Sequence, residues 1–140
     1  MTRIDFYRYA EDKLRYACRL AATVAERDSR LVVFAPDTQV LSTFDRLLWT
    51  FQSTRFVPHC RATDAIATET PVILASGEEP LPHHDVLLNL GDDWPPFFAS
   101  FERLLEIVGA DEEDKLRARG RFVFYRKRGY EINVNAITEA

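Results

Sequence analysis

The sequence predicts an α/β fold: a three-layer α/β/α sandwich around a mostly parallel β-sheet, in a single domain. Three observations support this prediction. Short, continuous apolar runs such as residues 31–35 are typical of parallel strands that are buried on both faces. Stretches with apolar residues at i, i+3, i+4 and i+7 lie between these runs and are typical of amphipathic helices. Finally, a length of 140 residues suits one hydrophobic core.

The first half of the chain is predicted to contain three strands and two helices. The strand positions alternate in polarity or are continuously apolar, whereas the helix positions repeat with helical spacing. The first helix has a face of small side chains, which suits close packing on a sheet. In chain order we predict a strand at 3–7, a helix at 14–25, a strand at 31–35, a helix from Asp37 or Thr38 to Phe51, and a short strand at 56–57.

The second half is predicted to contain two more strands, at 71–75 and 86–90, and two more helices. Proline is favoured in the first turn of a helix, so the third helix is expected to begin near Pro95. It would end at Gly109 and bury Phe97, Phe98, Phe101, Leu104, Leu105 and Val108. The last helix, at about 111–128, has acidic residues at its start and basic residues at its end, as the helix dipole favours. The short tail from Tyr130 is expected to be only partly ordered.

Charge is distributed unevenly along the chain. The formal net charge is −4, yet the segment 115–128 contains seven basic residues and no acidic one. This pattern predicts a cationic face on an otherwise acidic protein. No apolar run approaches the length of about 20 residues that a membrane-spanning helix needs, and no signal-peptide core is present. The two cysteines, Cys18 and Cys60, are expected to be free thiols.

The residue patterns of common enzyme sites are missing. None of the five glycines belongs to a dinucleotide-binding G-x-G-x-x-G motif or a phosphate-binding loop. The three histidines, His59, His83 and His84, lack the spacing of a metal site. Cys60 and His59 are not expected to form a catalytic cysteine–histidine pair, because they are adjacent and neighbouring residues of a strand point to opposite faces. The sequence therefore predicts no catalytic, metal-binding or cofactor-binding residues.

Trp49 is in an unusual position for a large apolar side chain. At 100° per residue, it lies about 140° from the centre of the apolar stripe of its helix, so it should face away from the sheet. Tryptophan is the residue most enriched at interface hot spots, which favours a protein-binding surface here. The alternative is that the helix ends early and Trp49 turns back into the core.

A second candidate site lies where the third predicted helix meets the basic one. If these helices are antiparallel, Val108 would meet Arg119, Phe122 and Val123 in a shallow apolar pocket with guanidinium groups on its rim. Such a pocket suits an acidic peptide that ends in a hydrophobic residue with a free carboxylate. It also suits the phosphates of a nucleic acid. The amino-acid composition of this region does not show which of these two ligands binds.

Several short motifs resemble the DNA polymerase III chi subunit family over nearly the whole chain. The more specific motifs are a tryptophan block, Leu47-Leu48-Trp49 followed by Phe56-Val57-Pro58-His59, and a C-terminal arginine–aromatic pattern. The latter comprises Ala118-Arg119-Gly120-Arg121-Phe122, Tyr125-Arg126 and Gly129-Tyr130. Asp5-Phe6-Tyr7 and Asp85-Val86-Leu87-Leu88-Asn89-Leu90 also match.

The resemblance implies a non-catalytic α/β adaptor of DNA replication, in a bacterial cytoplasmic holoenzyme with DNA-directed DNA polymerase (nucleotidyltransferase) activity. It implies a one-to-one heterodimer with the psi subunit, which anchors the pair to the clamp loader. It also implies a contact with the acidic, phenylalanine-ended C-terminal tail of single-stranded-DNA-binding protein. The residues that match the family's psi-binding surface are Trp49, Phe56 and Pro58. A helicase is a further candidate partner for this tryptophan surface, and no membrane partner is implied.

The residues that match the family's tail-binding pocket are Val108, Arg119 and Phe122. The chain departs from the family pattern at two positions, because a tyrosine often stands at the position of Phe122 and a lysine at that of Val123. Without that hydroxyl group and that charge, we expect the affinity for the tail to fall, or the contacts to shift to Arg121 or Arg126. The alternative hypothesis is a module whose basic helix binds nucleic acid directly.

Overall fold

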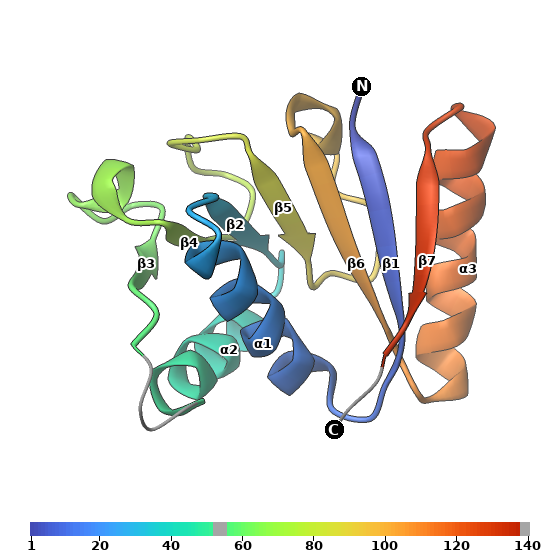
Figure 1. Ribbon diagram of the computed structural model, residues 1–140, viewed down its shortest axis with the longest axis horizontal. Helices are drawn as coiled ribbons and strands as arrows, with labels where there is room; N and C mark the ends of the chain where they lie inside the picture. Colours follow the sequence, from blue (N-terminus) through green and yellow to red (C-terminus); the bar gives the residue numbers. More distant parts are fainter. Residues whose placement is uncertain (52–55, 138–140) are drawn as a thin grey trace.

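A computed structural model describes residues 1–51 and 56–137, which form one parallel sheet with helices on both faces (Figure 1). The elements in chain order are β1 (Arg3–Ala10), α1 (Lys13–Glu26), β2 (Leu31–Phe34), α2 (Thr38–Thr50), β3 (His59–Arg61), β4 (Val72–Ala75), β5 (Val86–Asn89), β6 (Arg103–Gly109), α3 (Glu112–Lys127) and β7 (Ile132–Ala136). The strand order across the sheet is β3-β4-β2-β5-β6-β1-β7. Every pairing between these strands is parallel, so the predicted fold class is confirmed.

The sheet divides the core into two layers. In β2, Leu31 and Val33 pack beneath α1 and α2, whereas Val32 and Phe34 belong to the cluster on the opposite face, which contains α3. All four side chains are buried, because this central strand is covered on both sides, as its continuous apolar run predicts. Figure 1 shows α1 and α2 in front of the sheet and α3 behind its other end.

The helix boundaries follow the capping signals in the sequence. The Asp37 carboxylate accepts a hydrogen bond from the Gln39 N–H at 2.9 Å, so Asp37, one of the two predicted candidates, is the N-cap of α2. At the other end of α3, Gly129 has a φ of 81° and its N–H donates to the Arg126 carbonyl at 3.0 Å. This left-handed conformation favours glycine and closes the helix. Among the described residues, no helix is both long enough and apolar enough to cross a membrane.

The predicted third helix at 95–108 is wrong. This segment contains a short 3₁₀ turn, Phe98–Ser100, followed by the strand β6, which pairs with β5 and β1. The spacing of its apolar residues fits a helix, but the run 104–108 is also continuously apolar and is buried on both faces. Periodicity alone does not separate a buried strand from a buried helix. The pairing partners on both sides decide in favour of the strand.

Two other boundaries also differ from the prediction. The tail after Tyr130 forms β7, in which Ile132 and Val134 alternate with asparagines and pair in parallel with β1. Local composition gives a weak strand signal here, and the exposed edge of β1 supplies the stabilising hydrogen bonds. The short strand expected at 56–57 begins instead at His59, after Pro58, which lacks an N–H to donate.

The side chain of Asp114 connects the start of α3 to the end of β6 through a hydrogen bond. Its Oδ2 atom accepts a hydrogen bond from the Gly109 N–H at 2.6 Å, and Lys13 Nζ lies 3.3 Å from Oδ1. Burial opposes ionisation of this carboxyl group, but the bond from Gly109 and the charge of Lys13 outweigh it and hold the pKa below its ordinary value.

We expect Asp114→Ala to lower the free energy of unfolding by about 1–3 kcal/mol at neutral pH, because the Gly109 N–H loses its acceptor. A carboxyl group whose pKa is lowered by folding stabilises the folded state at pH values above its ordinary pKa. This stabilisation is lost as the pH falls through the pKa of the folded state. The difference in unfolding free energy between the wild type and the variant should therefore be greatest at pH 7, and it should shrink at pH values below the ordinary pKa of 3.8. Urea unfolding at a series of pH values measures it. A difference that grows on acidification would contradict the assignment.

Candidate functional site: a basic pocket and a tryptophan surface

A cavity of about 550 Å³ lies between residues 112–122 of α3 and the strands β1, β6 and β7. Its apolar wall comprises Phe6, Val108, Ala118, Phe122 and Val134. The Phe122 ring packs edge-on against Phe6 with a centroid distance of 5.6 Å. The pocket predicted from Val108, Arg119 and Phe122 is thus present as a cavity. It is formed by one helix and three strands, however, and not by two antiparallel helices.

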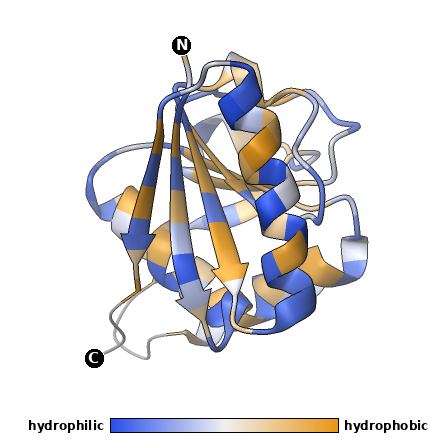
Figure 2. Cartoon of the chain, turned by 90° about the vertical axis from the view of Figure 1, so that its right-hand side faces the viewer, coloured by the Kyte–Doolittle hydropathy of each residue, from blue (hydrophilic) through white to orange (hydrophobic). Residues whose placement is uncertain are grey.

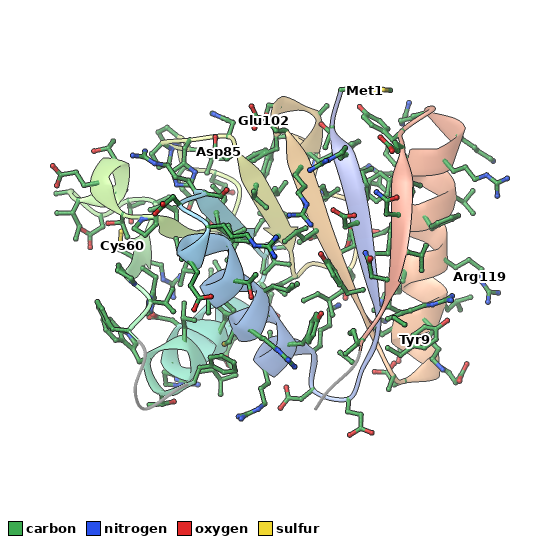
Figure 3. The ribbon with its side chains drawn as sticks, viewed as in Figure 1. Met1, Tyr9, Cys60, Asp85, Glu102 and Arg119 are labelled. Carbon is green, nitrogen blue, oxygen red and sulfur yellow. The ribbon has the colours of Figure 1, made fainter. Side chains whose placement is uncertain are left out.

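Three basic side chains line this cavity: Arg8, Lys115 and Arg119. Lys115 Nζ lies 4.6 Å from the centre of the Tyr9 ring and 3.4 Å from Glu112 Oε1. Arg119 is exposed and forms no ion pair within the described part of the chain. Figure 3 shows Arg119 projecting outward from α3, with Tyr9 beside the same helix. A hydrophobic group in this cavity would therefore lie beside a cation that is free to meet a carboxylate.

Arg121 does not take part in the pocket. Its side chain is 1% exposed and lies on the sheet-facing side of α3, where its Nε donates to Glu106 Oε1 at 3.0 Å. The Tyr125 hydroxyl donates to Glu106 Oε2 at 2.5 Å, and Asn89 Nδ2 donates to the same atom at 3.0 Å. Burial and the neighbouring carboxylate raise the pKa of Tyr125 well above its ordinary value. This polar cluster anchors α3 to the sheet.

Arg126, the other arginine named from the sequence, is exposed and lies outside the cavity. It lies seven residues after Arg119, which is close to two helical turns, so both project from the same side of α3. Lys115 and Phe122 occupy this side too. The side is therefore a stripe of three cations and one aromatic ring that continues from the cavity along the helix.

The opposite end of the sheet has the second candidate surface. Trp49, at the C-terminal end of α2, is 53% exposed, as its place on the helix predicted. Its ring lies 5.2 Å from that of Phe56, which is 66% exposed, and 4.5 Å from that of His59. Pro58 is exposed beside them. Three apolar groups named from the sequence, Trp49, Phe56 and Pro58, therefore form one surface.

The buried side chain of His59 supports this surface through its contact with the Trp49 ring. The imidazole is buried, with Nδ1 2.7 Å from the Val57 carbonyl oxygen and Nε2 2.8 Å from Asp45 Oδ1. A ring that is bonded at both nitrogens has a fixed orientation, so it is a firm support for the Trp49 ring.

Sequence reasoning missed several residues of the basic pocket, in particular Arg8, Tyr9, Lys115 and Val134. The first two lie more than 90 positions before α3, and only the pairing of β1 with β6 and β7 brings them to it. Lys115 could have been found, because it lies four residues before Arg119 on the same side of the helix. Figure 2 shows this end of the molecule, with α3 beside the strands at the edge of the sheet.

Comparison with known proteins identifies related chains. The family model described as "DNA polymerase III chi subunit, HolC" matches residues 1–133. The DNA polymerase III subunit chi of Pseudomonas aeruginosa is 35% identical over 94% of this chain and 94% of its own length. The subunits chi of Haemophilus influenzae and Escherichia coli are 27% and 26% identical, over 86% and 83% of this chain and 85% and 80% of their own lengths.

Proposed function

Because the chain belongs to the DNA polymerase III chi subunit family, it is an accessory subunit in DNA replication, and we propose that it is a non-catalytic bridge between two partners. The first partner is the psi subunit, which connects the chain to the clamp loader at the replisome. The second is the acidic, phenylalanine-ended C-terminal tail of single-stranded-DNA-binding protein.

The observation that carries this proposal is the separation of the two candidate surfaces. The tryptophan surface adjoins β3, the first strand of the sheet, and the basic pocket adjoins β7, the last one (Figure 1). Partners bound at the two ends would not compete for space. This arrangement supports an adaptor that holds both partners at once.

The chemistry of the pocket supports a peptide with a free carboxyl end. The apolar wall of Phe6, Val108 and Phe122 suits an aromatic ring, and Arg119, which has no ion pair among the described residues, is placed to meet the terminal carboxylate. A charge-assisted hydrogen bond of this kind contributes roughly 1.5–3 kcal/mol. With one apolar anchor and the entropic cost of ordering the peptide, we expect a dissociation constant of about 1 μM.

Direct binding of nucleic acid by the basic helix is the second candidate function. It is favoured by Arg119, Arg126 and Lys127, which are exposed and without ion pairs in the described residues. Phosphate contacts by these side chains would depend steeply on salt concentration. Salt also weakens the binding of an acidic peptide, so salt dependence does not distinguish the two functions. A requirement for a free carboxyl end on the ligand does distinguish them.

We expect Arg119→Ala to weaken binding of a short acidic peptide that ends in phenylalanine by about tenfold or more, because the terminal carboxylate loses its charged donor. Amidation of the peptide's carboxyl end should have a similar effect on the wild type. Titration calorimetry measures both, and Arg19→Ala, at an exposed site on α1, is the control with no expected change. If amidated and free peptides bind equally well, or if single-stranded DNA displaces both, nucleic-acid binding is the better proposal.

A further inference from the structure

β7 is an edge strand with an unused row of backbone hydrogen-bonding groups. It pairs with β1 alone among the described strands. The Glu131 carbonyl accepts from the Ile4 N–H, and the Ile137 N–H donates to the Arg8 carbonyl, so the odd-numbered residues of this segment bond toward β1. The N–H and C=O groups of Ile132, Val134 and Ala136 therefore point outward. Within the described part of the chain these outward groups have no partner.

This edge lacks the usual protection against pairing with another chain. Exposed edges are normally blocked by charged side chains, by proline or by a bulge. The β7 sequence, Ile-Asn-Val-Asn-Ala, contains neither a charge nor a proline, and its pairing with β1 is regular. Val134 at its centre is 46% exposed and lines the basic pocket. The open edge is thus continuous with the candidate peptide site.

The charge beside this edge is cationic. Lys115, Arg119 and Arg126 lie on one side of α3, the side that also contributes Phe122 to the pocket. Figure 1 shows α3 extending past β7 at this end of the sheet. A segment placed on the outer edge of β7 would therefore lie along the stripe of cations, which favours an acidic segment.

We propose that the acidic tail binds as an additional strand on the outer edge of β7, parallel to it, with its terminal side chain in the basic pocket. This inference rests on the proposed function of the pocket. Arg8 and Val108 place the pocket at the carboxyl-terminal ends of β1 and β6, and these strands run parallel to β7. A tail that ends there and follows the edge must run in the same direction as β7. Main-chain hydrogen bonds then supply affinity, and alternate side chains supply specificity.

The geometry also sets the register of the tail. Because α3 joins the parallel strands β6 and β7, it runs in the opposite direction to them, so Arg126 lies upstream of the pocket along the bound tail. Seven residues of helix separate Arg119 and Arg126 by about 10 Å. An extended chain covers this in about three residues. Arg126 is therefore placed to meet an acidic side chain about three positions before the terminal residue.

Hydrogen exchange of the wild-type protein, measured by NMR with and without the peptide, tests the pairing. We expect saturating peptide to slow exchange by about tenfold at the outward amides of Val134 and Ala136. The amides of Asn133 and Asn135, which face β1, are internal controls whose exchange should change much less. If the peptide binds and the outward amides exchange as before, the added strand is wrong while the proposed pocket stands. If the peptide does not bind, the proposed function itself fails.

Modification of the peptide backbone gives a second test that leaves the protein unchanged. Methylation of one amide nitrogen at a time should weaken binding by about tenfold at alternate positions, where an N–H faces β7, and by less than about twofold between them. Losses without this alternation would overturn the proposal.

The register has its own test. Arg126→Ala should weaken binding several-fold when the third residue before the end is acidic, and should have no effect when that residue is neutral. Lys127→Ala, one position along the helix and on a different side, is the matched control. An equal effect of Arg126→Ala on both peptides would overturn the register.

Discussion

Replacing Arg121 with methionine is expected to lower the free energy of unfolding by about 3–5 kcal/mol. Glu106, which is fully buried, would lose its only cationic partner among the described residues, and hydrogen bonds from Tyr125 and Asn89 would remain. A buried carboxylate without a counter-charge is costly, because neither water nor a cation compensates for its lost hydration. Methionine keeps most of the side-chain volume, so the loss would report on charge more than on packing. Urea unfolding at pH 7 measures it.

Arg119→Met is the matched control for this experiment. The substitution is the same and lies two residues away on the same helix, but Arg119 is exposed and has no ion pair within residues 1–51 and 56–137. The unfolding free energy of this variant should therefore differ from that of the wild type by less than about 0.5 kcal/mol. Arg121→Met should therefore lower the stability of the fold, whereas Arg119→Met should leave the stability unchanged and weaken peptide binding. If Arg121→Met were as stable as the wild type and bound the acidic peptide tenfold more weakly, Arg121 would belong to the pocket.

Trp49→Ala is expected to weaken binding of the psi subunit by about 2 kcal/mol or more, which is about thirtyfold. The ring is half exposed, and it packs against Phe56 and the fixed imidazole of His59, so it is presented rigidly to a partner. Rigid aromatic anchors lose little conformational entropy on binding, which is why their truncation is costly. Titration of the purified psi subunit measures the loss, and circular dichroism checks the fold.

The second tryptophan provides the control. Trp94 is 38% exposed and stacks on Phe124 of α3 at a centroid distance of 3.6 Å, so it lies on the α3 side of the sheet, away from the tryptophan surface. Trp94→Ala should leave psi binding unchanged. A Trp49→Ala variant that fails to fold would place Trp49 among the stabilising residues of the core, and a loss of psi binding in both variants would indicate a general effect on the fold.

Signals that act over a few residues predicted a large part of the fold. The start of α2 is predicted to within one residue, at Asp37 or Thr38, because capping is decided by the nearest backbone groups. Trp49 was placed outward by the same kind of reasoning, since the direction of a helical side chain depends only on its position in the helix. The sequence predicts the strand β2 because the continuous apolar run 31–35 suits a strand that is covered on both faces.

The basic pocket is formed by residues that are far apart in the sequence, and the sequence predicted it less well. The sequence named Val108, Arg119 and Phe122 correctly as neighbours, but it placed Val108 on a helix and included Arg121 on the wrong side of α3. An arginine is normally an exposed residue, but this one points inward because the buried carboxylate of Glu106 and the carbonyl oxygen of Asp92 accept hydrogen bonds from its guanidinium group.

The sequence by itself determined the α/β class, the start of α2, the outward tryptophan and the basic character of α3, because each depends on local spacing and composition. The tertiary structure alone decided that residues 103–109 are a strand, that the tail becomes β7, and which arginine meets solvent. Arg8 and Val134 join the pocket only because β1 pairs with both β6 and β7. Hydrogen bonds between distant strands fix these outcomes, and no short stretch of sequence contains both partners of such a bond.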